Sequence, residues 1–91
     1  MIVRLTKEAE RDLVKIHSDI ASDNERAAER VIARILQSLH YLEMLPELGR
    51  LGRREGTREL SIAGLPYFAV YRIESETVRV LTIIHTRRQW P

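Results

Sequence analysis

The sequence contains no cysteine, which excludes disulfide bonds, thiolate chemistry and zinc–thiolate sites. It also lacks internal repeats and low-complexity segments, so its 91 residues predict a single domain, residues 1–91. No apolar run approaches the ~20 residues that span a membrane, and no signal-like stretch follows Met1. With 44% hydrophobic and 31% charged residues, the chain has an ordinary globular composition. We therefore expect a soluble, cytoplasmic protein with no membrane association.

Lysine is nearly absent from the sequence, and the arginines are unevenly placed. Residues 1–48 carry seven basic and nine acidic side chains, a balance of −2, whereas residues 49–91 carry eight basic and four acidic ones, a balance of +4. All eight are arginines, whose planar guanidinium suits carboxylates and phosphates. The second half either meets an anionic partner, such as a nucleic acid or an acidic protein segment, or forms a solvated basic sheet edge.

The first half of the chain has the apolar spacing of a helical hairpin. Ile2–Leu5 predicts a short edge strand, and Thr6 is placed to cap the helix that follows. Ser22 and Glu25 resemble a capping box that starts a second helix, which should stop just before Pro46. Each helix carries one apolar stripe at steps of three and four: Ala9, Leu13, Ile16 and Ile20; then Ala28, Val31, Ile35, Leu39 and Leu42.

The second half changes to a period of two. Residues 46–56 read as an irregular connection, and Arg58–Ile62, Tyr67–Ile73 and Val78–Ile84 read as antiparallel strands joined by turns. Alternation divides the middle strand into two faces: Tyr67, Ala69, Tyr71 and Ile73 toward the core; Phe68, Val70 and Arg72 toward the open side. We predict an α+β fold in which the N-terminal helical hairpin packs on one face of a three- to four-stranded, mainly antiparallel sheet.

Catalytic and metal-binding patterns are mostly missing. The three histidines, His17, His40 and His85, lie on separate predicted elements, so no metal site and no cofactor is expected. Metal-free RNA cleavage needs a base, cations around the phosphate and an acid. The strands offer only Glu59 and His85 as a base, and a local hydrogen bond at a strand end explains His85 equally well.

Several segments taken together resemble the RelE/ParE superfamily of type II toxin–antitoxin toxins. After the helical hairpin these are GR.GR..GTREL, GLPYFAVYRI and the closing IIHTRRQWP. The resemblance covers essentially the whole chain and implies one of two activities: RelE-like toxins cleave mRNA on the ribosome, and ParE-like toxins poison DNA gyrase. Phe68 stands where the nucleases carry an arginine, the preceding strand lacks their lysines, and Trp90 stands near their tyrosine. Only Arg87 matches the nuclease set, so the chain is closer to ParE.

The resemblance implies a growth-arresting toxin that inhibits DNA gyrase, of the kind that stabilises plasmids, with no catalytic residue of its own. We expect the target to contact arginines and the lone tryptophan: Arg58, Arg72, Arg87, Arg88 and Trp90. A cognate, ParD-like antitoxin should bind apolar side chains: Leu48, Leu51, Phe68 and Val70. Nucleic acid would be met only indirectly or through the antitoxin.

Three alternatives remain at this point. An mRNA interferase would use His85 or Glu59 together with Arg58, Arg72 and Arg87. A degenerate member would only bind its antitoxin. Trp90 could also fold back as a lid on the core, because a lone tryptophan is usually well buried.

Overall fold

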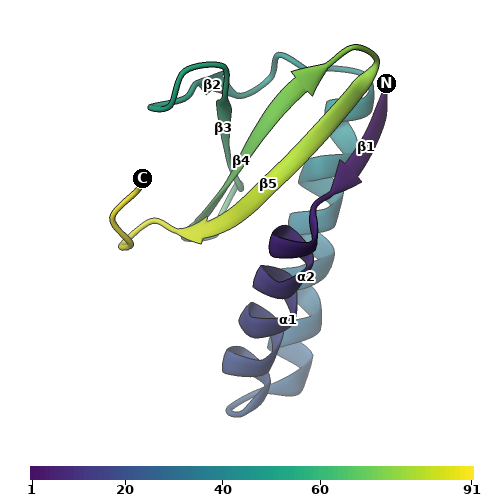
Figure 1. Cartoon of the computed structure of the whole chain (residues 1–91). Coiled ribbons are helices and arrows are strands. Elements are labelled where there is room, and N and C mark those ends of the chain that lie inside the picture. The colour runs from purple at the N-terminus through teal and green to yellow at the C-terminus, as the bar shows by residue number, and fades with distance from the viewer.

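The computed structural model describes residues 1–91 and has two layers, a helical hairpin and a five-stranded sheet (Figure 1). The elements in chain order are β1 (Ile2–Leu5), α1 (Lys7–Ala21), α2 (Glu25–His40), the 3-10 turn η1 (Tyr41–Glu43), β2 (Arg50–Leu51), β3 (Arg58–Ser61), β4 (Tyr67–Glu74) and β5 (Thr77–His85). The strand order is β1-β5-β4-β3-β2, with β1 parallel to β5 and all other pairs antiparallel. The predicted fold class is confirmed. The sheet has one strand more than the upper number expected, since β2, with only two residues, was not predicted.

Side-chain caps set the helix boundaries. Thr6 caps α1 as predicted, with its hydroxyl accepting from Ala9 N at 3.1 Å. The predicted Ser22 cap for α2 is wrong: Asn24 caps that helix by accepting from Ala27 N at 3.0 Å. Ser22 is still helical in its backbone and donates its hydroxyl to Asp19 O, so it closes α1 instead. The helical run ends before Pro46 as expected, with η1 as its last turn.

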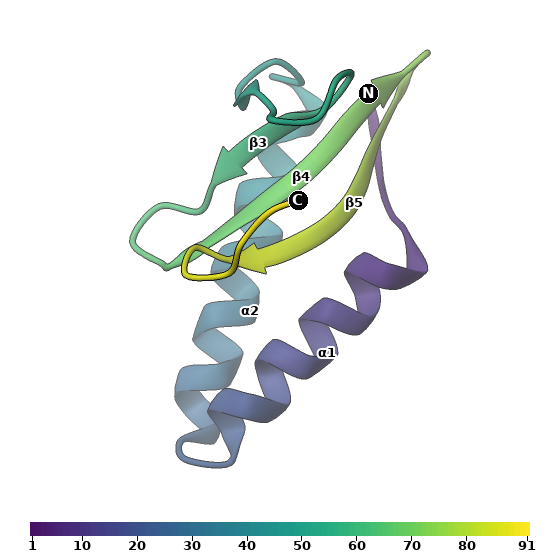
Figure 2. The same cartoon turned by 60° about the vertical axis from the view of Figure 1, so that its left-hand side comes forward.

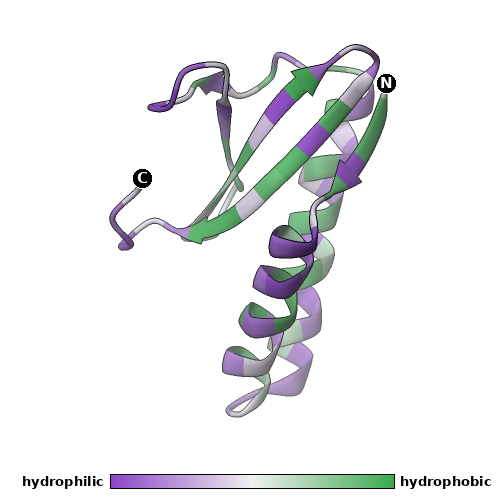
Figure 3. Ribbon diagram, in the orientation of Figure 1, coloured by the Kyte–Doolittle hydropathy of each residue, from purple (hydrophilic) through white to green (hydrophobic).

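The helices cover one face of the sheet, and their distal halves extend beyond the strands (Figure 2). Green, hydrophobic bands line the inner sides of both helices, and purple, hydrophilic bands lie outside (Figure 3). The main core joins apolar residues of both layers: Ala9, Ile16, Ile35, Leu39, Leu42, Leu60, Ile62, Ala69, Tyr71, Val78, Val80 and Ile83. No helix is long and apolar enough to cross a membrane.

Tyr71 anchors the 46–49 connection from inside this core. Its hydroxyl donates to Pro46 O at 2.7 Å and accepts from Gly49 N at 2.9 Å. A side chain at Gly49 would meet the Tyr71 hydroxyl at 2.8 Å, so only glycine fits there. Burial raises the pKa of Tyr71, which keeps the hydroxyl protonated as the donor that Pro46 O requires.

The alternation predicted for β4 is confirmed, and β5 departs from simple alternation. Val70 pairs with Thr82 and Tyr71 pairs with Val80, so Leu81 is an extra residue that forms a β-bulge. Past the bulge, β1 no longer pairs with β5. There the Asp12 carboxylate of α1 accepts from Ile83 N at 3.0 Å and from the Thr82 hydroxyl. A helix side chain thus replaces a strand as the hydrogen-bond partner of β5.

Tyr71→Phe should lower the free energy of unfolding by about 1–2 kcal/mol, because buried Gly49 N–H loses its partner. Urea denaturation of the purified chain measures this change. Tyr41→Phe is the matched control, since Tyr41 is about half exposed and its hydroxyl forms no hydrogen bond. Equal stabilities of the two variants would show that the Tyr71 hydroxyl does not hold the connection.

Candidate functional site

The face of the sheet away from the helices, here called the open face, carries a second apolar cluster. Phe68, Val70 and Ile84 form it, and Leu81 and Trp90 pack against it. The C-terminal tail, residues 86–91, turns back across this face after β5 (Figure 2). The open face is therefore closed over its middle by the chain's own end. The alternative in which Trp90 packs back onto apolar side chains is the one that the structure adopts.

The β2–β3 loop holds the tail in place through two arginines. The Arg53 guanidinium lies 5.3 Å from the centre of the Phe68 ring and donates to Trp90 O at 3.1 Å. Arg54 lies 5.5 Å from the centre of the Trp90 ring. Stacked arginines and aromatic rings attract each other by cation–π interaction. The expected exposure of Phe68 and Val70 is wrong, because this cover leaves the two side chains 4% and 0% exposed.

Glu59 fixes the loop that carries these arginines. It lies on the open face opposite Val70 and is almost fully buried. Its carboxylate accepts from Arg50 Nη2 at 3.2 Å and from Arg53 N at 3.0 Å, and Arg53 Nε lies 3.5 Å away. Burial by itself raises the pKa of Glu59, but the Arg53 N–H and the two guanidinium groups outweigh it, so its pKa lies below the usual value. This carboxylate is a structural anchor, and its side chain is only 1% exposed.

The residues predicted to contact a target do not form one group. Arg58 pairs with core-facing Tyr71 and therefore lies on the helix side, where it donates to Gly49 O at 2.7 Å. Arg58 and Arg72 were both predicted to contact the target, but their side chains lie on opposite faces of the sheet. Arg72 lies on the open face, five residues along β4 from Tyr67, or about 16 Å at the usual rise per residue. Tyr67 pairs with His85, where the tail begins.

Arg87 and Arg88 are exposed at the turn that follows β5, at the opposite end of the sheet from Arg72. Of the four predicted arginines, Arg87 and Arg88 are exposed and Arg58 and Arg72 are half-buried, and the four do not lie together. The set needed for an mRNA interferase is likewise not assembled. His85 and Arg58 lie on the helix side, and Glu59 and Arg72 lie on the open face.

His85 borders a small hollow of about 160 Å³ between α1 and the end of β5. Its Nδ1 accepts from Arg87 N at 3.0 Å, and its ring meets the Tyr67 ring edge-on at 5.3 Å. Burial and then the charge of Asp19 raise the pKa of Tyr67. Two acids and two bases line the hollow together with Ile16 and Ile83: Asp12, Asp19, Lys15 and Arg88. The balanced charges favour no ion of either sign.

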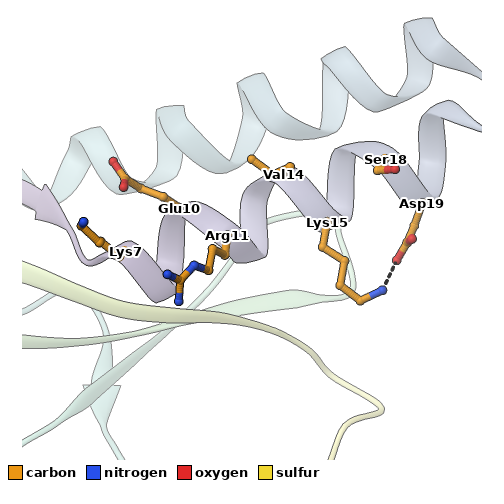
Figure 4. Close-up of a pocket in the computed structure, with 7 residues that line it drawn as sticks. All are labelled: Lys7, Glu10, Arg11, Val14, Lys15, Ser18 and Asp19. Carbon is orange, nitrogen blue, oxygen red and sulfur yellow. Dashed lines mark hydrogen bonds and ion pairs between the residues drawn. The ribbon is translucent and has the colours of Figure 1, made fainter.

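A second, larger hollow runs along the outside of α1 (Figure 4). Its seven lining residues all come from that one helix: Lys7, Glu10, Arg11, Val14, Lys15, Ser18 and Asp19. Lys15 bonds Asp19 at 3.1 Å inside it. Because a single helix supplies every wall, this is an open surface and not a binding cleft. No group of three or more acidic or histidine side chains is placed to hold a metal ion.

Two surface features were not predicted from the sequence. The first is a row of arginines on the open face, in which Arg4 pairs with Arg79 and Arg79 pairs with Arg72 across three strands. The second, here called the η1 patch, is a set of exposed apolar side chains around η1 and the N-terminus: Met1, Tyr41, Met44, Leu45 and Leu48. A hydrogen bond from the Met1 amino group to Glu43 O, 2.8 Å, joins the two segments. Of the predicted apolar contacts, Leu48 and Leu51 are exposed, at 50% and 77%.

Glu59→Gln should lower the free energy of unfolding at pH 7 by about 1–3 kcal/mol, the range for hydrogen bonds to a charged group. The native carboxylate has a lowered pKa, so its contribution is present above the unfolded-state pKa of about 4.3 and lost as the pH falls through the folded value. The gap between wild type and variant in urea denaturation should therefore close below about pH 4. Glu55→Gln, at an exposed position of the same loop, should show no such gap.

Comparison with known proteins places this architecture in a family. A model described as "ParE toxin of type II toxin-antitoxin system, parDE" matches residues 3–90. The protein named "Putative toxin Y4kP" from Sinorhizobium fredii is 44% identical over 89 residues, which cover 98% of this chain and 92% of that protein.

Solved structures share the fold. A chain of the chromosomal ParDE toxin–antitoxin system from P. aeruginosa superposes with a TM-score of 0.87 at 22% identity, over 93% of this chain and 95% of that one. A chain of the RelBE2 toxin–antitoxin complex from Mycobacterium tuberculosis gives 0.70 at 31% identity, over 92% and 95%. The predicted RelE/ParE relationship is confirmed, and the chain belongs to the ParE toxin family of type II toxin–antitoxin systems.

Proposed function

We propose that this toxin arrests growth by binding DNA gyrase, and that a cognate antitoxin neutralises it by covering part of its surface. The observation that carries the gyrase proposal is that the groups on the open face are already held by contacts within the chain. Its one buried carboxylate, Glu59, is held by Arg50 and Arg53, and the tail covers the middle of the face. A toxin with this surface has groups for binding a partner but none arranged for chemistry.

RNA cleavage would need a base close to the cations that stabilise the phosphate in the transition state. On the open face, Glu59 is buried in its ion pairs and Glu74 is paired with Arg79 at 3.2 Å. His85 lies on the other side of the sheet, and its Nδ1 already accepts the Arg87 N–H. These positions support a binding toxin over a ribonuclease.

The exposed arginines support a protein target. Arg87 and Arg88 are exposed at the tail turn, and neither guanidinium has a carboxylate partner. Arginine is prominent in the residues that dominate protein–protein affinity. Arg72 supplies a further guanidinium at the other end of the open face. Trp90 contributes indirectly in this proposal, because it holds the tail that carries the two exposed arginines.

The η1 patch and Leu51 supply the surface that we assign to the antitoxin. Met44, Leu51 and Leu45 are 84%, 77% and 56% exposed, unusual for large apolar side chains in so small a protein. The matched relatives from P. aeruginosa and M. tuberculosis were solved as parts of toxin–antitoxin systems. An antitoxin segment that is disordered alone and folds on binding would bury these side chains.

Induction of this chain without an antitoxin should stop the incorporation of labelled thymidine before that of labelled amino acids. Gyrase inhibition blocks replication directly, whereas translation fades later. Purified chain should also block supercoiling by purified gyrase. Arg87→Glu/Arg88→Glu should relieve both effects. Collapse of translation within minutes while thymidine uptake continues would overturn the gyrase proposal.

Met44→Asp/Leu48→Asp should weaken antitoxin binding on the order of 100-fold, because two charges would enter an apolar contact. Isothermal calorimetry with the purified antitoxin measures the change. Val14→Asp is the control, since Val14 is 69% exposed on the outer side of α1. Unchanged affinity of the double variant would place the antitoxin elsewhere.

A further inference from the structure

The arginine row on the open face is formed by direct cross-strand neighbours. Arg4 of β1 is opposite Arg79 of β5, and Arg79 is opposite Arg72 of β4. At the usual spacing between strands, the three Cα atoms span about 10 Å across the sheet. Figure 3 shows hydrophilic bands that cross β1, β5 and β4 at neighbouring positions. Three guanidinium groups from distant parts of the sequence thus share one strip of surface.

The fold leaves most of this charge uncompensated. Arg79 alone has a carboxylate partner, Glu74 at 3.2 Å, and neither Arg4 nor Arg72 forms an ion pair. Like charges directly opposite each other destabilise a sheet. Arg4 and Arg79 are exposed, whereas Arg72 is half-buried beside the β2–β3 loop. A Cβ on Gly56, whose φ is +78°, would lie 2.6 Å from Arg72 Nη1, so the glycine leaves room for this guanidinium.

We infer that the arginine row binds an acidic, extended segment of the protein that the toxin attacks. The inference rests on the proposed function, because it assumes a protein target. In an extended segment, side chains at alternate positions project to one side, about 7 Å apart. Two acidic residues at such positions would lie within reach of the flexible Arg4 and Arg72 side chains at the two ends of the row. Guanidinium forks bind carboxylates with two parallel hydrogen bonds.

The surroundings of the row favour a peptide over a nucleic acid. Proteins that bind single strands combine basic grooves with aromatic rings on which bases stack. The aromatic rings of the open face are Phe68 and Trp90, and both are occupied, by Arg53 and Arg54 respectively. Exposed Ile2 and the carboxylate of Glu74 border the row, and the latter repels phosphates. An acidic peptide can use the arginines without any stacking surface.

The chemistry of the row also suits a target better than an antitoxin. A stored toxin–antitoxin complex needs a stable interface, and stable interfaces bury apolar side chains, which the η1 patch offers. Charged surfaces chiefly accelerate encounter and select the partner. A toxin that must find its target quickly after release gains from such a surface.

The test is the double charge reversal Arg4→Glu/Arg72→Glu, compared with Arg26→Glu/Arg30→Glu on the exposed side of α2. Both variants change the net charge by the same amount, and none of the four arginines forms an ion pair. The row variant places acids opposite Arg79, so its melting temperature should equal or exceed that of the wild type. Its inhibition of purified gyrase should nevertheless fall on the order of 100-fold, as for like charges brought into contact. The control variant should inhibit fully, and antitoxin binding should be unchanged in both.

Full inhibition by the row variant would overturn the inference and leave the proposed function standing. If the wild type arrests growth without inhibiting gyrase, the gyrase proposal fails. Loss of growth arrest in the row variant, but not in the control variant, would then still support target binding by the arginine row. Loss of antitoxin binding with unchanged inhibition would assign the row to the antitoxin and overturn the inference. Row-dependent binding of a labelled 20-nucleotide single-stranded RNA would overturn the assignment to a peptide. A wild-type chain that neither arrests growth nor inhibits gyrase would overturn both proposals.

Discussion

The buried Glu59 carboxylate, held between Arg50 and Arg53, is the interaction on which the open face depends. Burying a charge is unfavourable unless partners satisfy it, and removing a partner leaves the buried charge uncompensated. Here the partners come from β2 and the loop after it, so the same contacts that satisfy Glu59 also fix the loop. Arg53 then reaches Phe68 and the Trp90 carbonyl. The position of the C-terminal tail therefore follows from a carboxylate in β3.

This arrangement divides the open face into parts with different chemistry. The middle is apolar and covered by the tail, one end carries the arginine row, and the other end carries the exposed arginines of the tail turn. The helix side contributes the η1 patch, which is apolar and exposed. A small single domain can thus present separate charged and apolar surfaces. Its main core lies in the space between the helices and the sheet.

Local patterns predicted the main elements, because the helices and long strands have clear periods. Thr6 and the alternation in β4 were correct for this reason. The choice between Ser22 and Asn24 as a cap was not predictable, since both residue types cap helices and the backbone between the helices decides. β2 was missed because two residues cannot show a period. The bulge at Leu81 was also invisible to a period of two.

The candidate site was harder to predict than the fold, since it depends on long-range register. Arg4 and Arg79 are 75 positions apart, and only the parallel pairing of β1 with β5 makes them neighbours. Arg58 and Arg72 both flank turns in an arginine-rich region, and their separation follows from the pairing of Arg58 with Tyr71. The cover over Phe68 and Val70 depends on contact between the C-terminal tail and the β2–β3 loop, which no local pattern indicates.

The contact of Asp12 with β5 has a consequence for self-association. Where β1 ends, the Ile83 N–H would otherwise project from an unpaired strand border, the kind of template that recruits a further chain. The Asp12 carboxylate occupies that donor and places a negative charge on the border. The outer sides of β1 and β2 have no strand partner, and neither do the parts of β5 and β3 that these short strands do not reach. Edge-to-edge assembly into ribbons at high concentration could therefore not use the Ile83 N–H of β5 unless the Asp12 contact opened first.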